Sequence, residues 1–144
     1  MPTNTIKWLI AGFLLLHGLG HIGALVSIVV DWQARGTTTG AWLPARSWLL
    51  PSLTPQTAKL IASIFWIVST LGFVAAAFSF WGVLLPGDLW RPLAMVTGVI
   101  SAVGILLFLG NWPTFNTVAA LGANVAVFVT QLGMHWPPTS MFGK

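Results

Sequence analysis

Two histidines, His17 and His21, stand four residues apart inside the first long apolar stretch of the sequence. Because an α-helix turns once in about 3.6 residues, a helix there places both imidazoles on one face. Imidazole can ligate a metal or a tetrapyrrole, transfer a proton or form hydrogen bonds. An ionisable side chain at bilayer depth is costly and almost always faces protein. The pair therefore predicts a polar site between helices, and Gly20 and Ala24 on the same face predict close approach of a neighbouring helix.

Metal binding and catalysis lack the other groups that they need. Zinc and copper sites usually take three or four strong ligands, and the apolar stretches contain no cysteine, aspartate or glutamate. The third histidine, His135, follows the last apolar stretch, and the His-Glu-x-x-His pattern of zinc hydrolases is absent. Proton and ion transport usually rely on buried charged groups, which these stretches also lack. We therefore predict no metal site and no catalytic residue.

Lipid-soluble cofactors require fewer ligands. One imidazole is enough for the magnesium of a chlorophyll or for a five-coordinate haem, whereas a six-coordinate haem needs ligands on both sides of its ring. His17 and His21 project from one helix face, so they do not sandwich one iron within a single subunit. A quinone is a further alternative. So is a structural role, in which both rings only form hydrogen bonds between helices.

The composition excludes a water-soluble fold. The 144 residues are 56% hydrophobic and 6% charged, with a mean hydropathy of +0.88. Soluble domains carry about 25% charged residues. The net charge of +4 comes from six basic and two acidic residues, without the clustered lysines and arginines of a nucleic-acid surface. The absence of cysteine excludes disulfides and thiolate metal sites.

Four apolar segments are each long enough to cross the hydrocarbon core of a bilayer, which takes about 20 helical residues. They are Ile6–Val30, Thr57–Trp81, Trp90–Leu109 and Phe115–Met134. Short alternating strands, the signature of a membrane barrel, are not visible. The sequence predicts an all-α, integral membrane four-helix bundle, with residues 1–144 as one transmembrane domain. We expect the first segment to be retained, because it is too long for a secretory signal and no cleavage site closes it.

The link between the first two segments, residues 31–56, contains Trp42, Arg46 and Trp48. One interpretation is a stretch in the headgroup region, with both indoles dipping inward and the arginine on lipid phosphate. The other is an ordinary loop with a few interfacial anchors. Basic residues are divided evenly between the two predicted sides of the membrane, so the positive-inside rule assigns no orientation.

Helical wheels give every predicted helix one small or polar face and one bulky apolar face. The polar side chains that we assign to a shared cofactor-binding site are His17, His21, Thr70, Ser101, Asn124 and Gln131. In the second helix Ser63, Thr70 and Ala77 define the inward face at seven-residue intervals. We expect polar groups from all four helices to meet near the bilayer midplane. For most of these residues, hydrogen bonding between packed helices is the simpler role.

The pattern His17-Gly18-x-x-His21, the tryptophan-bearing Arg46-Ser-Trp-Leu-Leu50 and four spans in about 140 residues resemble a known group. They are similar to small bacterial four-helix membrane proteins of the DoxX-like group. The resemblance implies a bacterial cytoplasmic (inner) membrane location. It implies no reaction and assigns no functional residue.

The leading hypothesis from the sequence is a non-catalytic membrane protein that acts by packing. It would be an accessory subunit of a larger membrane complex or a homo-oligomer, because its short loops leave little extramembrane machinery. Its expected partners are the lipid bilayer and other membrane subunits or itself. The alternative is a binder of a chlorin, haem, quinone or other lipid-soluble molecule, in a pocket lined by His17, His21, Asn124 and Gln131.

Overall fold

The computed structural model describes residues 3–30 and 46–138. This part of the chain forms four α-helices, α1 (Thr3–Val30), α2 (Pro55–Trp81), α3 (Trp90–Leu107) and α4 (Thr114–Phe128), and α4 continues into a π-helical turn, η2 (Val129–Gly133). All four helices are long and apolar enough to span a membrane. The prediction of four helices of membrane-spanning length and no strand is confirmed for these residues, and the predicted ends lie within one helical turn of the observed ones. Trp42 and residues 31–45 of the predicted interfacial link lie outside the described residues.

The ends of α2 show why the chain starts and stops a helix there. Thr54 caps the first turn, because its hydroxyl accepts a hydrogen bond from the Thr57 N–H at 3.2 Å, and Pro55 fits the first helical position. At the other end Gly82 adopts φ 67°, a left-handed conformation that glycine tolerates best. This turn lets the Val83 N–H reach the Phe78 carbonyl at 3.0 Å and stops the helix.

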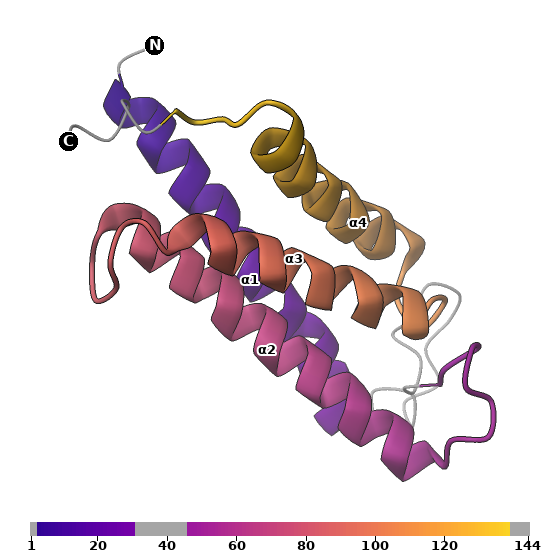
Figure 1. Ribbon diagram of the computed structural model, residues 1–144. Helices are drawn as coiled ribbons and strands as arrows, with labels where there is room; N and C mark the ends of the chain where they lie inside the picture. The colour runs from indigo at the N-terminus through magenta and orange to yellow at the C-terminus, as the bar shows by residue number, and fades with distance from the viewer. Residues whose placement is uncertain (1–2, 31–45, 139–144) are drawn as a thin grey trace.

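The helices pack in the order of the chain. α1 packs along α2, α2 along α3, and α4 lies mainly against α3. Contact between α1 and α4 is sparse, and Figure 1 shows α4 set apart from α1 across the bundle. Because neighbouring helices run in opposite directions, α1 begins and α4 ends at the same end of the bundle (Figure 1).

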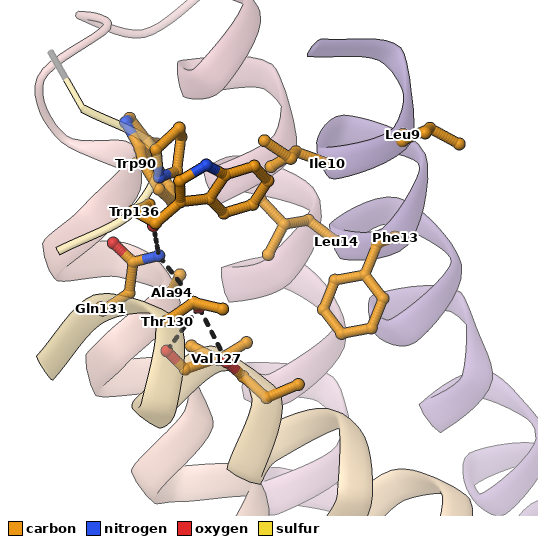
Figure 2. A pocket seen from close by; sticks show the side chains of 12 residues that line it. Leu9, Ile10, Phe13, Leu14, Trp90, Ala94, Val127, Thr130, Gln131 and Trp136 are labelled. Carbon is orange, nitrogen blue, oxygen red and sulfur yellow. Dashed lines mark hydrogen bonds between the residues drawn. The ribbon is translucent and has the colours of Figure 1, made fainter. Parts of the chain in front are cut away.

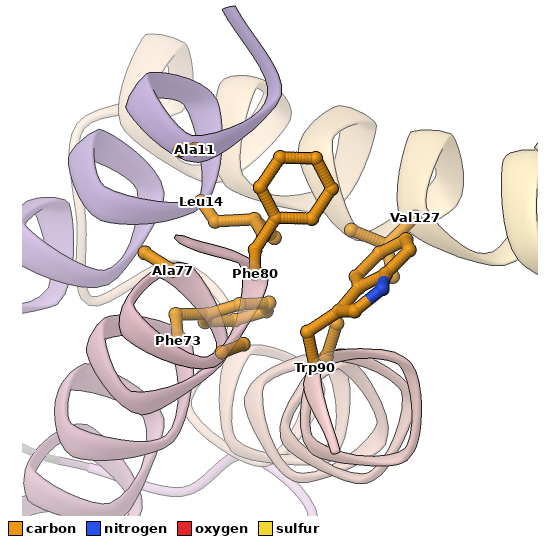
Figure 3. Packing of buried hydrophobic residues seen from close by; sticks show 9 residues of the cluster. Ala11, Leu14, Phe73, Ala77, Phe80, Trp90 and Val127 are labelled. Carbon is orange, nitrogen blue, oxygen red and sulfur yellow. The ribbon is translucent and has the colours of Figure 1, made fainter. Parts of the chain in front are cut away.

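The interior consists of two hydrophobic clusters with a polar layer between them. The first cluster, nearest the start of α1, comprises Ala11, Leu14, Phe73, Ala76, Ala77, Phe80, Trp90, Ala94 and Val127 (Figure 3). The second cluster, nearest the end of α1, comprises Ala24, Ala58, Ala62, Trp66, Ile105 and Phe108. Along α1, α3 and α4 the residues between the two clusters include His17, His21, Ser101 and Asn124. The structure thus has a polar layer at the middle of the bundle.

Two glycines allow the helices to approach closely. A Cβ on Gly72 of α2 would lie 2.1 Å from the Thr97 hydroxyl oxygen of α3. A Cβ on Gly18 of α1 would lie 3.0 Å from the Phe73 Cβ of α2. Small residues at helix contacts are typical of membrane bundles, where dispersion between closely packed backbones drives association. These two positions set the spacing of the α1–α2 and α2–α3 pairs.

The described part of the first link is attached to the α3–α4 turn. The Trp48 indole Nε1 donates to the Leu106 carbonyl at 2.6 Å, and the Asn111 side-chain amide donates to the Arg46 carbonyl at 3.0 Å. The Trp48 ring remains 60% exposed. An exposed indole with its N–H bonded is suited to the membrane interface.

Candidate functional site

A chain of three hydrogen bonds joins α1, α3 and α4 in the polar layer. The His17 Nε2 lies 2.9 Å from the Asn124 Oδ1, and the Asn124 Nδ2 donates to the Ser101 Oγ at 2.9 Å. The Ser101 Oγ lies 3.1 Å from the His21 Nε2. His21, Ser101 and Asn124 are almost completely buried. Four of the six predicted site residues therefore meet in one network.

The network fixes the position of the His17 proton. An amide oxygen can only accept, so the His17 Nε2 carries a hydrogen and donates it to the Asn124 Oδ1, and the lone pair of a neutral His17 lies on its Nδ1. The Ser101 oxygen accepts from the Asn124 amide. Toward the His21 Nε2 it either donates its own hydrogen or accepts a second N–H, because a hydroxyl oxygen has two lone pairs. A ligand reaches these rings through Nδ1 or a ring face, unless the hydrogen-bond chain is broken.

Aromatic rings hold His21 in place. Its imidazole stacks on the Trp66 ring at 5.7 Å with an interplanar angle of 3°, and near-parallel to the Phe73 ring at 6.3 Å. The Trp112 ring lies 6.3 Å from it at a tilt of 56°. The His17 ring meets the edge of Phe73 at 4.4 Å. α2 contributes the Trp66 and Phe73 rings rather than hydrogen bonds to the network, and the α3–α4 turn contributes Trp112.

A pocket of about 210 Å³ opens beside the two histidines, between α1 and the start of α4. It is lined by Leu16, His17, Gly20, His21, Ala24, Trp112, Phe115, Asn116, Ala119 and Ala120. Leu16, Phe115 and Ala119 are exposed at its rim. We call this space the histidine pocket. It opens sideways, toward the region that lipid chains occupy around a spanning helix.

Thr70 and Gln131, the two other predicted site residues, lie outside the network. The Thr70 hydroxyl is buried without a hydrogen-bond partner. The neighbouring Ser69 lies on the fully buried face of α2, and its hydroxyl also has no hydrogen-bond partner. The Gln131 side-chain amide donates to the Trp136 carbonyl at 2.8 Å. Gln131 lines a different pocket, on the other side of the His17–Asn124 bond.

The structure also changes the expected role of Gly20. We predicted that this residue allows another helix to approach, but a Cβ built on it meets nothing within 4 Å. The close approach occurs at Gly18 instead, on the side of α1 that faces α2. Gly20 lines the histidine pocket, so its missing side chain enlarges that pocket.

Trp112, Phe115 and Asn116 line the pocket but were not predicted as site residues. They lie in the α3–α4 turn and the first turn of α4. The sequence signal for them was weak, because aromatic and amide residues are common where a helix meets the membrane surface. Asn116 occurs two turns before Asn124, on the same helix face, and this spacing could have indicated it.

The geometry does not suit every cofactor that the sequence left open. The Nε2 atoms of both histidines are used within the protein, and a tetrapyrrole ligated there would have to break the network. A volume of 210 Å³ is also below the range of about 300–1,000 Å³ that pockets for drug-sized ligands occupy. Within residues 3–30 and 46–138, no three His, Cys, Asp or Glu side chains form a group that could hold a metal ion.

Comparisons with known proteins add no assignment. No protein-family model, no curated protein and no solved structure matches this chain. The resemblance to the DoxX-like group therefore stays a prediction from the sequence.

Proposed function

We propose that this protein binds a lipid-soluble molecule with a single-ring polar head, of the quinone class, in the histidine pocket. The observation that carries the proposal is that both intramembrane histidines line one laterally open pocket, next to Trp112 and Phe115. Ionisable residues within membrane spans typically mark functional sites. The protein binds the ligand and, on this proposal, performs no chemistry on it.

The chemistry of the walls favours a flat ring with oxygen substituents. Trp112 and Phe115 offer aromatic surface, against which rings stack in offset or edge-on arrangements. The His17 Nδ1 supplies an acceptor for a hydroxyl, and the His21 Nδ1 offers a donor or an acceptor according to the tautomer of that ring. The Asn116 side chain adds an amide at the rim. A quinone or quinol head carries the matching carbonyls or hydroxyls.

The size and the opening favour a small head with a tail outside. A single ring fits a space of 210 Å³, whereas a tetrapyrrole macrocycle is much larger. Because the pocket opens between α1 and α4, an isoprenoid or alkyl tail can leave it into the bilayer. The ligand then enters from the membrane and never crosses water.

Ala119→Phe is expected to weaken this binding. Ala119 is exposed at the rim, so a phenyl ring there fills the pocket without displacing the core. Wild-type protein reconstituted with a short-tailed benzoquinone, repurified and extracted should retain the quinone, as measured by its ultraviolet absorbance. We expect the variant to retain about tenfold less, a loss of about 1.4 kcal/mol.

The matched control is Ala126→Phe. Ala126 is an exposed alanine on the same helix, seven residues further along, and it lines the other pocket. This variant should retain the quinone at the wild-type level. Quinone retention that is equal in wild type and Ala119→Phe, or absent from the wild type, would contradict the proposal.

Lateral association with a partner membrane helix is the second candidate function. Ala119, Gly122 and Ala126 are exposed on α4 at the spacing of small-residue helix contacts, and a Cβ on Gly122 meets nothing within 4 Å. This face suits a second copy of the chain or another membrane subunit.

Gly122→Leu separates the second candidate from the first, because Gly122 lines neither pocket. Wild-type protein in lipid nanodiscs should have the mass of an oligomer or of a complex with a co-purifying subunit. The variant should be monomeric and still bind quinone. A monomeric wild type without a co-purifying subunit would exclude this function.

A further inference from the structure

A second pocket lies on the other side of the His17–Asn124 bond, toward the end of the bundle where α1 begins and α4 ends. Its volume is about 250 Å³, and α1, the start of α3 and the end of α4 surround it. Figure 2 shows Ile10 and Leu14 on one side and Trp136 and Val127 on the other. We call this space the terminal pocket. Its walls are almost entirely apolar, so it suits hydrocarbon rather than a polar head.

The helix ends place the terminal pocket near the membrane surface. Trp90 is the first residue of α3, and Trp136 follows the π-helical turn that ends α4. Trp90 is buried in the first hydrophobic cluster, whereas the Trp136 side chain is partly exposed, as is typical of an indole at the level of the lipid headgroups. The pocket therefore extends from the headgroup level into the hydrocarbon, as the acyl chain of a lipid does.

Two basic side chains lie at this end of the bundle. Lys7 precedes Ile10 and Leu14 at the i, i+3, i+7 spacing, so it shares their helix face one turn nearer the surface. Arg91 follows Trp90, and its guanidinium donates to the carbonyl of Pro137, a residue of the pocket wall. Asp88 is an acidic residue near the start of α3, and it is exposed. The charge beside the pocket is therefore net positive.

We propose that the terminal pocket binds one acyl chain of an anionic phospholipid, whose phosphate lies near Lys7 and Arg91. Basic pockets between transmembrane helices are typical sites for anionic lipid headgroups. The guanidinium retains further N–H donors besides the one used on Pro137, and these suit phosphate oxygens. This inference does not depend on quinone binding, because the two pockets share no residue.

The experiment is native mass spectrometry of the purified protein with either phosphatidylglycerol or phosphatidylcholine added in detergent. Wild type should bind one phosphatidylglycerol in preference to phosphatidylcholine. Since one basic residue near an anionic surface contributes about fivefold in affinity, Lys7→Gln should reduce the preference about fivefold. Ala126→Phe, which fills the pocket, should remove the bound lipid.

Ala119→Phe is the control, because it fills only the histidine pocket and should leave phosphatidylglycerol binding unchanged. Arg91→Gln also removes a hydrogen bond to Pro137, so Lys7→Gln is the decisive charge variant. Thermal unfolding of each variant confirms that it is folded. Any of three results would overturn the inference. Wild type would bind the two lipids equally, Ala126→Phe would bind phosphatidylglycerol fully, or Lys7→Gln would keep the full preference for phosphatidylglycerol.

Discussion

Gly72→Ala is expected to lower the free energy of unfolding by about 2 kcal/mol. The added Cβ would lie 2.1 Å from the Thr97 Oγ1, 2.8 Å from its Cγ2 and 3.0 Å from its Cβ. The whole Thr97 side chain blocks the methyl group, so rotation about one bond does not relieve the clash and α2 must move away from α3. Overpacking of this kind costs about 3 kcal/mol, and the better helix propensity of alanine offsets about 1 kcal/mol.

The measurement is unfolding of the protein in mild detergent, followed by tryptophan fluorescence. Gly12→Ala is the matched control, because a Cβ on Gly12 meets nothing within 4 Å and the same propensity gain applies. Adding Thr97→Ala to Gly72→Ala removes the two nearest atoms and should restore most of the stability. Unchanged stability of Gly72→Ala would show that the α2–α3 spacing differs from the one described.

Asn124→Ala should destabilise the protein by a similar amount, about 2 kcal/mol. Asn124 is 1% exposed and links His17 to Ser101, so its truncation leaves the partly buried His17 N–H without its acceptor and the buried Ser101 hydroxyl with only its bond to His21. An unsatisfied buried polar group costs about 1–3 kcal/mol in water-soluble proteins. Interhelical hydrogen bonds in membranes contribute less, about 0.6 kcal/mol on average. We therefore expect the loss of both Asn124 hydrogen bonds to lower the free energy of unfolding by no more than about 2 kcal/mol.

Asn116→Ala provides the comparison, because Asn116 is exposed on the same helix and its loss should leave unfolding unchanged. A second readout is specific to the network. The ¹⁵N chemical shifts of the His17 imidazole should show its hydrogen on Nε2, and Asn124→Ala should remove this preference. A wild-type His17 with its hydrogen on Nδ1 would contradict the hydrogen-bond chain, even if the stability changes as expected.

Much of the fold follows from composition and periodicity. Apolar segments of spanning length with prolines and glycines between them fix the four helices, because lipid leaves the backbone no other partner. The predicted division of each helix into a small or polar face and a bulky apolar face holds for α3: Ala94, Thr97, Ser101 and Gly104 are buried, while Val96, Val99 and Val103 are exposed. Polar groups were expected to meet from all four helices at mid-depth, and those of α1, α3 and α4 do, whereas α2 adds no hydrogen bond to them.

The wheel for α2 holds only in part: Ala77 is buried, but the fully buried face runs through Trp66, Ser69 and Phe73 rather than through Ser63 and Thr70. Thr70 is consequently partly buried and its neighbour Ser69 occupies the buried stripe. For Gln131 the helix itself changes, because the Met134 N–H bonds to the Val129 carbonyl five residues back. Such a π-helical turn rotates the following side chains away from the α-helical pattern. Nothing in the local sequence indicates the position of the buried face of α2 or the π-helical turn at Gln131.

Sparse contact between α1 and α4 bears on how the chain assembles. Each helix meets its main neighbour in the helix synthesised just before it, so hairpins form in the order of translation and the contacts are largely local. The bond from His17 to Asn124 joins residues 107 positions apart and brings the first helix to the last. Together with Val127, which packs in one cluster with Ala11 and Leu14, that imidazole–amide link closes an arc of four helices into a ring.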